Sequence, residues 1–253
     1  MIKAPLPTRR NEITYKRKVK RMVLPPMHQV PVVGVLMLDT SFERIPGDIG
    51  NAASFAVPVS YKIVSGATIT RVVKEADPSL LKPFIEAAHE LEAEGVRMIT
   101  TSCGFLALFQ KEMGQALSVP FYSSSLLQIP FVHSITGGPI GILTARKSSL
   151  TERHLAAVGA SHVPVVIYGM DDKPAFTSAI VDETEKLDPV KVEAEMVEKA
   201  LEMRQNHPDL KAVVLECTNM PPYKEKIKQA AGLPVFDIFT LTDFVCSGLP
   251  SRK

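Results

Sequence analysis

The sequence predicts an α/β fold built from two similar halves, each a parallel sheet flanked by helices. Three observations predict it: short β-branched apolar runs, amphipathic stretches between them, and an internal repeat that places two cysteines at matching positions. Apolar runs that alternate with helical stretches are typical of parallel sheets covered on both faces. The chain has 253 residues, 45% of them hydrophobic, which is enough for one large domain or two small ones.

Each expected element follows from a local pattern. Runs of two to eight residues, rich in β-branched side chains, predict buried strands over 32–38, 61–64, 96–100, 119–122, 140–144, 163–168, 212–215 and 235–236. The amphipathic stretches between them predict helices over 79–94, 105–115, 126–133, 149–158, 189–205, 222–231 and 240–247. Asp77-Pro78 and Asp188-Pro189 fit helix starts, an N-cap followed by proline.

The first thirty residues differ from the rest, because basic pairs and prolines replace the apolar periodicity. We expect residues 1–30 to form a solvated or subunit-wrapping arm, and an arm that recruits nucleic acid or anionic lipid is the alternative. The net charge of +2 gives no general reason to expect a nucleic-acid or membrane partner. No apolar run is long enough to span a bilayer, and no signal peptide is recognisable.

The three cysteines are far apart in the chain and form no metal-binding spacing. We therefore expect reduced thiols in a cytoplasmic protein, with no metal site.

The internal repeat divides the chain into residues 31–136 and 137–253, with a return of the chain between halves near its C-terminus left open. The run at 33–37 resembles the run at 140–144, and the run before Cys103 resembles the run before Cys217. The two cysteines are separated by the same interval as Pro120 and Pro234, since 217 − 103 = 114 and 234 − 120 = 114. Each half thus has one cysteine directly after a buried strand and before a helix.

A cysteine at that place is a candidate for chemistry. Ligands of open parallel sheets bind beyond the carboxyl ends of the strands. A helix N-terminus favours negative charge, so we expect the pKa of each thiol to be lowered from about 8.5. Two opposed thiols, Cys103 and Cys217, can remove a proton from one face of a carbon and deliver one to the other. The alternative is a buried cysteine that acts as a small hydrophobe, which is the interpretation we prefer for Cys246.

Uncharged donors around the two cysteines suit a substrate carboxylate. Backbone and hydroxyl groups of this kind hold carboxylates without a salt bridge. Helix capping by the same hydroxyls is the structural alternative. The candidates for substrate binding are Thr101, Ser102, Gly104, Thr144, Thr218 and Asn219.

The segment from Glu216 to Pro221, Glu-Cys-Thr-Asn-Met-Pro, resembles the Cys-Thr-x-x-Pro motif of the aspartate/glutamate racemase superfamily. The superfamily includes hydantoin racemases, maleate isomerases and arylmalonate decarboxylases, and the segment from Gly141 to Thr144 is similar to the start of its second half. The resemblance implies two flavodoxin-like halves with the active site between them, Cys103 and Cys217 as base and acid, and a homo-oligomer. Asp39 is a further candidate for the site, because it stands where the family has Asp-Ser-Gly after the first strand.

One departure bears on the substrate. Racemases of acidic amino acids follow the first cysteine with Asn-Thr, whereas Cys103 is followed by Gly104 and Phe105. We therefore expect a cofactor-independent racemase or epimerase of another small carboxylate, an amino acid or hydantoin-like compound. The alternatives are a single-cysteine decarboxylase of a malonate-type acid, a maleate-type cis–trans isomerase, and a two-lobed binding protein without turnover.

Overall fold

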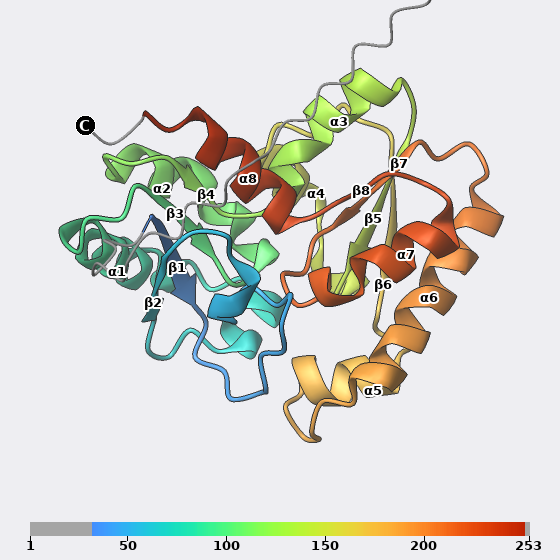
Figure 1. Ribbon diagram of the computed structural model, residues 1–253, viewed down its shortest axis with the longest axis horizontal. Coiled ribbons are helices and arrows are strands. Elements are labelled where there is room, and N and C mark those ends of the chain that lie inside the picture. Colours follow the sequence, from blue (N-terminus) through green and yellow to red (C-terminus); the bar gives the residue numbers. More distant parts are fainter. Residues whose placement is uncertain (1–31, 251–253) are drawn as a thin grey trace, which may run out of the picture.

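Two four-stranded parallel sheets form the framework of the protein (Figure 1). The computed structural model describes residues 32–250, so the arm predicted at 1–30 lies outside the described residues. In spatial order, the first sheet contains β2 (Val59–Ile63), β1 (Val33–Met37), β3 (Met98–Thr101) and β4 (Phe121–Tyr122). The second contains β6 (Val165–Gly169), β5 (Ile140–Thr144), β7 (Ala212–Leu215) and β8 (Val235–Phe236). The predicted fold class is confirmed, and this strand order begins the flavodoxin-like order.

Helices flank both sheets. Their bounds are α1 (Leu81–Ala93), α2 (Gln110–Ala116), α3 (Ile129–Thr136), α4 (Glu152–Ala157), α5 (Pro174–Phe176), α6 (Pro189–Asn206), α7 (Lys224–Ala231) and α8 (Ile238–Gly248). Asp188 caps α6 as expected, since its carboxylate accepts hydrogen bonds from two backbone N–H groups of the first turn. None of the helices in the described part of the chain is long and apolar enough to cross a membrane.

The two halves repeat one another in detail. Val33 pairs with Val59 and Met98 in the first sheet, and Ile140 pairs with Val165 and Ala212 at the same places in the second. Both halves also contain a π-helical turn that we did not predict, over Thr70–Lys74 and Thr177–Val181. Turns this short contain too few residues for a periodic pattern, so the sequence does not predict them.

Central strands β1 and β5 are completely buried, which explains their unbroken apolar sequences. Each contains a glycine against which a helix packs closely. A Cβ atom on Gly34 would lie 3.0 Å from a Leu91 methyl of α1, and one on Gly141 would lie 2.4 Å from the Met203 sulfur of α6. The repeat therefore fixes the helices and the strand ends at equivalent positions in the two halves.

The halves exchange their last helices. Helix α3 follows the first sheet in sequence but packs against β5 and β7 of the second. Helix α8 ends the chain but packs on the first sheet, where Ile238 and Leu241 join Val33 and Val35 in one apolar cluster. Figure 1 shows α8, in red, beside the lobe that contains β1 to β4. The exchange joins the two halves, and the domain boundaries that we expect near residues 30 and 136 remain predictions.

Candidate active site

The carboxyl ends of β3 and β7 present the two repeated cysteines to a single pocket between the halves. Cys103 follows β3, Cys217 follows β7, and both are free, buried thiols that line this pocket. The pocket walls are largely apolar and come from both halves: Phe42, Ile69, Val73, Phe105, Ile180 and Val181. As the sequence analysis predicted, the repeat places the two distant cysteines at one cavity.

Three other predicted binding residues line the pocket with the cysteines, namely Ser102, Gly104 and Asn219. The four remaining candidates are not among its lining residues. Asp39 is exposed and its carboxylate accepts a hydrogen bond from the backbone N–H of Gly66 at 3.0 Å. That contact supports a turn outside the pocket.

The predicted threonines support the cysteine loops from behind. Thr101 donates its hydroxyl to the carbonyl oxygens of Cys103, at 3.0 Å, and of Ser123, at 2.7 Å. Thr218 donates to the carbonyl oxygen of Ser102 at 2.5 Å, and so ties the second-half loop to the first-half loop. Thr144 donates to the Oε2 atom of Glu216 at 2.7 Å. These hydroxyls hold the loops in position, and all of them are already engaged.

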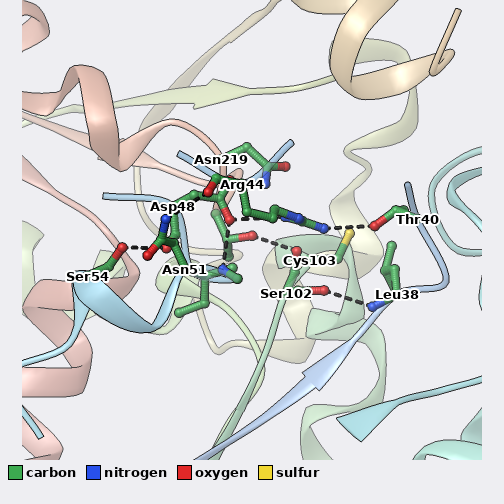
Figure 2. A network of polar contacts seen from close by, with 12 residues as sticks. Leu38, Thr40, Arg44, Asp48, Asn51, Ser54, Ser102, Cys103 and Asn219 are labelled. Atoms are coloured by element: carbon green, nitrogen blue, oxygen red, sulfur yellow. Dashed lines mark hydrogen bonds and ion pairs between the residues drawn. The ribbon is translucent and has the colours of Figure 1, made fainter. Parts of the chain in front are cut away.

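A chain of hydrogen bonds fixes the Cys217 thiol. The thiol donates to Oδ1 of Asn219 at 3.3 Å, and Nδ2 of Asn219 donates to the Asp48 carboxylate at 2.7 Å. Arg44 binds the other oxygen of Asp48 at 3.2 Å and donates to the Thr40 hydroxyl at 2.8 Å. Figure 2 shows Arg44 running from Asp48 to Thr40 past Cys103. The amide of Asn219 is thereby oriented with its oxygen toward the thiol.

Cys103 has a different environment, because backbone groups surround it in place of polar side chains. The N–H groups of Phe105 and Leu106 lie near its sulfur at the start of a 3-10 turn over Gly104–Phe109, and the Leu106 N–H donates to the Cys103 carbonyl oxygen at 3.1 Å. The helix predicted over 105–115 becomes α-helical only at Gln110, since the buried residues that follow Cys103 pack in this tighter turn. Oriented N–H groups of this kind favour a thiolate.

The prediction of a lowered thiol pKa is wrong. Burial raises the pKa of both Cys103 and Cys217 above the ordinary value, and the carboxylate of Glu216 raises each further. The opposing groups differ between the two. Arg44 and two backbone N–H groups favour the Cys103 thiolate. At Cys217 the backbone N–H of Asn219 favours the thiolate, whereas Cys103 and Asp48 disfavour it. The nearby charged groups therefore favour a thiolate at Cys103 over one at Cys217.

Sequence reasoning missed three charged residues of the site, Arg44, Asp48 and Glu216. Arg44 and Asp48 come from the long segment between β1 and β2, and nothing in the sequence indicates that this segment turns toward the cysteines. Glu216 is part of the recognised motif, directly before Cys217, and lines the pocket while completely buried. A charged residue at the end of an apolar strand was the signal that could have indicated it.

Glu216 also explains the glycine that follows Cys103. A Cβ atom on Gly104 would lie 2.2 Å from Oε1 of Glu216 and 2.3 Å from its carbonyl oxygen. No side chain fits at that place, so the asparagine that acidic amino-acid racemases have there cannot be accommodated. Gly104, the residue that departs from the racemase pattern, is thus explained by the space that Glu216 occupies.

Comparison with known proteins agrees with this architecture. A family profile described as Asp/Glu/Hydantoin racemase matches residues 129–242. Crystalline arylmalonate decarboxylase has the same fold, with a TM-score of 0.56 and 15% identity over 88% of this chain and 96% of that one. The expected resemblance to the superfamily is confirmed, by the profile over the second half of the chain and by the shared fold over most of it.

Several similar curated sequences are named as lyases and not as racemases. The dimethylsulfoniopropionate lyase of Durusdinium sp. clade D is 35% identical over 225 residues, which cover 85% of this chain and 74% of that protein. Dimethylsulfoniopropionate lyase 7 of Emiliania huxleyi is 32% identical over 84% of this chain, which spans 65% of its length. These relatives are enzymes. The chain therefore belongs to the family of the Durusdinium dimethylsulfoniopropionate lyase, and its second half matches the Asp/Glu/Hydantoin racemase profile.

Proposed function

We propose that this protein is a lyase that cleaves dimethylsulfoniopropionate, or a closely similar sulfonium carboxylate, into dimethyl sulfide and acrylate. One observation of the site carries the proposal: two free thiols and an arginine line one largely apolar pocket. The names of the similar curated sequences support a lyase, whereas the racemase that we expected has no named counterpart among them.

The pocket suits both ends of such a substrate. The dimethylsulfonium group has two methyl groups and no hydrogen-bond donor, which fits walls made of Phe105, Ile69, Val73 and similar side chains. The carboxylate end requires a cation or N–H donors. Arg44 supplies that cation, and its side chain is only 14% exposed, so its charge acts in a partly dry environment.

The reaction is a β-elimination that begins at the carbon next to the carboxylate. The Cys103 thiolate removes a proton from this α carbon and becomes a thiol. The electron pair left on the α carbon forms the double bond of acrylate while the bond from the β carbon to sulfur breaks. That bond's electrons stay on sulfur, so dimethyl sulfide departs neutral. Cys103 then releases its proton to water, and no cofactor is needed for any of these steps.

The Cys217 thiol takes the complementary role in this scheme. It is the thiol held protonated by its surroundings, through Asn219 and Asp48. When substrate binds, the thiol turns its one S–H from Asn219 to the substrate carboxylate, and it donates a hydrogen bond there as negative charge spreads onto that group during proton removal. Two thiols with different electrostatic environments fit an acid–base division of labour better than two equal bases.

A racemase or epimerase is the second candidate, because both thiols face the same pocket as stereoinversion requires. The single-cysteine decarboxylase would need Cys217 alone. A small carboxylate ligand and a homo-oligomer remain parts of the proposal.

One NMR experiment separates these reactions. The protein is incubated in D2O with dimethylsulfoniopropionate, and separately with chiral amino acids, hydantoins and malonates. We expect acrylate and dimethyl sulfide from the sulfonium compound. Deuterium exchange with loss of optical activity in the chiral compounds, and intact sulfonium substrate, would favour the racemase instead. The double variant with Cys103→Ser and Cys217→Ser should be inactive, and Cys246→Ser, which lies outside the pocket, is the matched control.

A further inference from the structure

Glu216 has a place in the pocket that neither the repeat nor the acid–base scheme explains. It follows β7, has no exposed surface, and lines the pocket beside Cys217. Its Oε2 atom accepts a hydrogen bond from Thr144, and the backbone N–H of Ala145 also donates to the carboxyl group. Its Oε1 atom is buried and has no hydrogen-bond partner within residues 32–250. A buried carboxyl oxygen without a partner costs free energy unless something in the pocket compensates it.

The other half of the molecule shows that a carboxylate is not required at this position for folding. The repeat interval of 114 places Ser102 where Glu216 stands in the second half. The hydroxyl of Ser102 accepts a hydrogen bond from the backbone N–H of Leu38 at 2.9 Å, in the way that Glu216 accepts one from Ala145. A small hydroxyl is therefore enough to satisfy the backbone, and the negative charge of Glu216 has another use.

Within the described residues, 32–250, no lysine, arginine or histidine forms an ion pair with Glu216. Arg44 also lines the pocket, but its hydrogen bonds go to Asp48 and Thr40, and none goes to Glu216. Burial is the largest influence on the carboxyl and raises the pKa of Glu216 to about 7, so the charged form lacks a partner near neutral pH. A cationic ligand without N–H groups can supply the missing charge. It needs only to reach Oε1 through the pocket.

We propose that Glu216 is the residue that selects a sulfonium carboxylate over a neutral carboxylate of the same shape, by placing its carboxylate against the sulfonium group. This inference rests on the proposed function and names the group that recognises the cationic end of the substrate. In this arrangement the apolar walls hold the methyl groups and Arg44 holds the carboxylate end. Among the described residues that line the pocket, Glu216 supplies the negative charge that distinguishes a sulfonium sulfur from a carbon atom.

The same charge couples binding to chemistry. The Glu216 carboxylate disfavours a thiolate at Cys103 and at Cys217 when the pocket holds no cation. A bound sulfonium neutralises that effect, so the Cys103 thiol loses its proton more readily with substrate than without it. After elimination the sulfur compound is neutral, and the restored negative charge of Glu216 disfavours the acrylate anion. The residue therefore promotes substrate entry and product release.

Two ligands that differ only in charge test the inference. One is dimethylsulfoniopropionate, and the other is isocaproate, in which a CH group replaces the sulfonium sulfur. Binding of both is measured by calorimetry to Cys103→Ser protein, which does not turn the substrate over, with and without Glu216→Gln. We expect the sulfonium compound to bind more tightly than isocaproate to the protein that has Glu216. Glu216→Gln should reduce this preference at least about tenfold, with isocaproate bound equally well or better.

Two further variants keep the result interpretable. Glu112→Gln removes an exposed carboxylate of α2 and should leave the preference unchanged. Glu216→Ser copies the residue of the first half and serves if the glutamine variant does not fold. An unchanged preference in the folded Glu216 variants, while the wild-type protein releases dimethyl sulfide, would overturn the inference and leave the lyase intact. A preference that depends on Glu216 in a protein that releases no dimethyl sulfide would support cation selection and contradict the lyase.

Discussion

The two cysteine loops occupy equivalent places in a repeated fold, yet their surroundings differ. In the first half, Cys103 stands between a serine that serves the backbone and a glycine, with backbone N–H groups at its sulfur. In the second half, Cys217 follows a buried glutamate and is hydrogen-bonded to an amide that Asp48 orients. The repeat thus supplies positions, and the divergence of the two loops supplies different protonation preferences.

The largest expected effect comes from removing each sulfur separately. We expect Cys103→Ser to lower kcat by about 10³-fold or more, because it removes the proposed base. Cys217→Ser should lower kcat by only about 10- to 100-fold, since a hydroxyl still donates a hydrogen bond. Rates of dimethyl sulfide release, measured at saturating substrate, check this order. Equal losses in the two variants would break the comparison between the loops.

The second prediction concerns stability and contrasts Glu216 with Ser102, its counterpart. Burial raises the pKa of Glu216 to about 7 in the folded protein from an ordinary value of 4.5. The protonated carboxyl is the favoured form, so its contribution is fully present below pH 4.5 and is lost as the pH rises through 7. Relative to Glu216→Gln, the wild-type free energy of unfolding should fall by about 3 kcal/mol over that range.

Urea unfolding of both proteins at several pH values provides the measurement. Parallel curves for the wild type and Glu216→Gln would mean that the carboxyl is not the buried, unpartnered group that the geometry describes. Ser102→Ala, which removes a hydroxyl that does not titrate, is the control for the first-half loop and should add no pH dependence.

Gly104 provides the third test, because it makes room for Glu216. A methyl group there would lie within 2.3 Å of the Glu216 backbone, so we expect Gly104→Ala to lower the free energy of unfolding by about 1–3 kcal/mol. Gly114→Ala in α2 is the matched control, since the nearest atom to its new methyl group is 3.7 Å away. That change should raise stability by about 0.5–1 kcal/mol. If both substitutions had the same effect, the close approach of the two loops would be in doubt.

The smallest expected effect lies at Asp48, which acts on Cys217 through Asn219. Asp48→Asn should lower kcat by about tenfold, because one amide oxygen is left where two carboxylate oxygens accept from Asn219 and Arg44. Combined with Cys217→Ser, the same substitution should cost much less, since the group that it positions is already changed. Additive effects on kcat in this double-mutant cycle would exclude a positioning role and leave Asp48 a purely structural residue.

Much of the fold was predictable because its strands and helices follow from local sequence patterns. The apolar runs of β1 and β5 predicted both central strands, and the equal spacing of cysteines and prolines predicted the repeat. The exchange of α3 and α8 between the halves was not predictable, because helix sequences show an apolar face and not the sheet that covers it.

The site was predictable only in part for a similar reason. Both cysteines follow strands, so the rim of the sheet could be inferred from sequence. Asp48 and Asn219 are 171 residues apart, and their contact depends on the course of a long loop. The predicted lowering of the thiol pKa was wrong. It was based on the position of each cysteine before a helix, which is a local feature, whereas burial and the Glu216 charge result from the packing of both halves. The proposal of a lyase depends on comparison with named relatives, since a pair of cysteines alone is compatible with several reactions.

The most direct test of the account uses dimethylsulfoniopropionate with both α hydrogens replaced by deuterium. If a thiolate removes one of them and the sulfur departs, wild-type protein in ordinary water will release dimethyl sulfide and an equal amount of acrylate that retains one deuterium at the α carbon. Proton NMR and mass spectrometry of the products read this out. Dimethyl sulfide accompanied by a hydroxy acid that retains both deuteriums would contradict α-proton removal. No dimethyl sulfide at all from folded protein would contradict the proposed function itself.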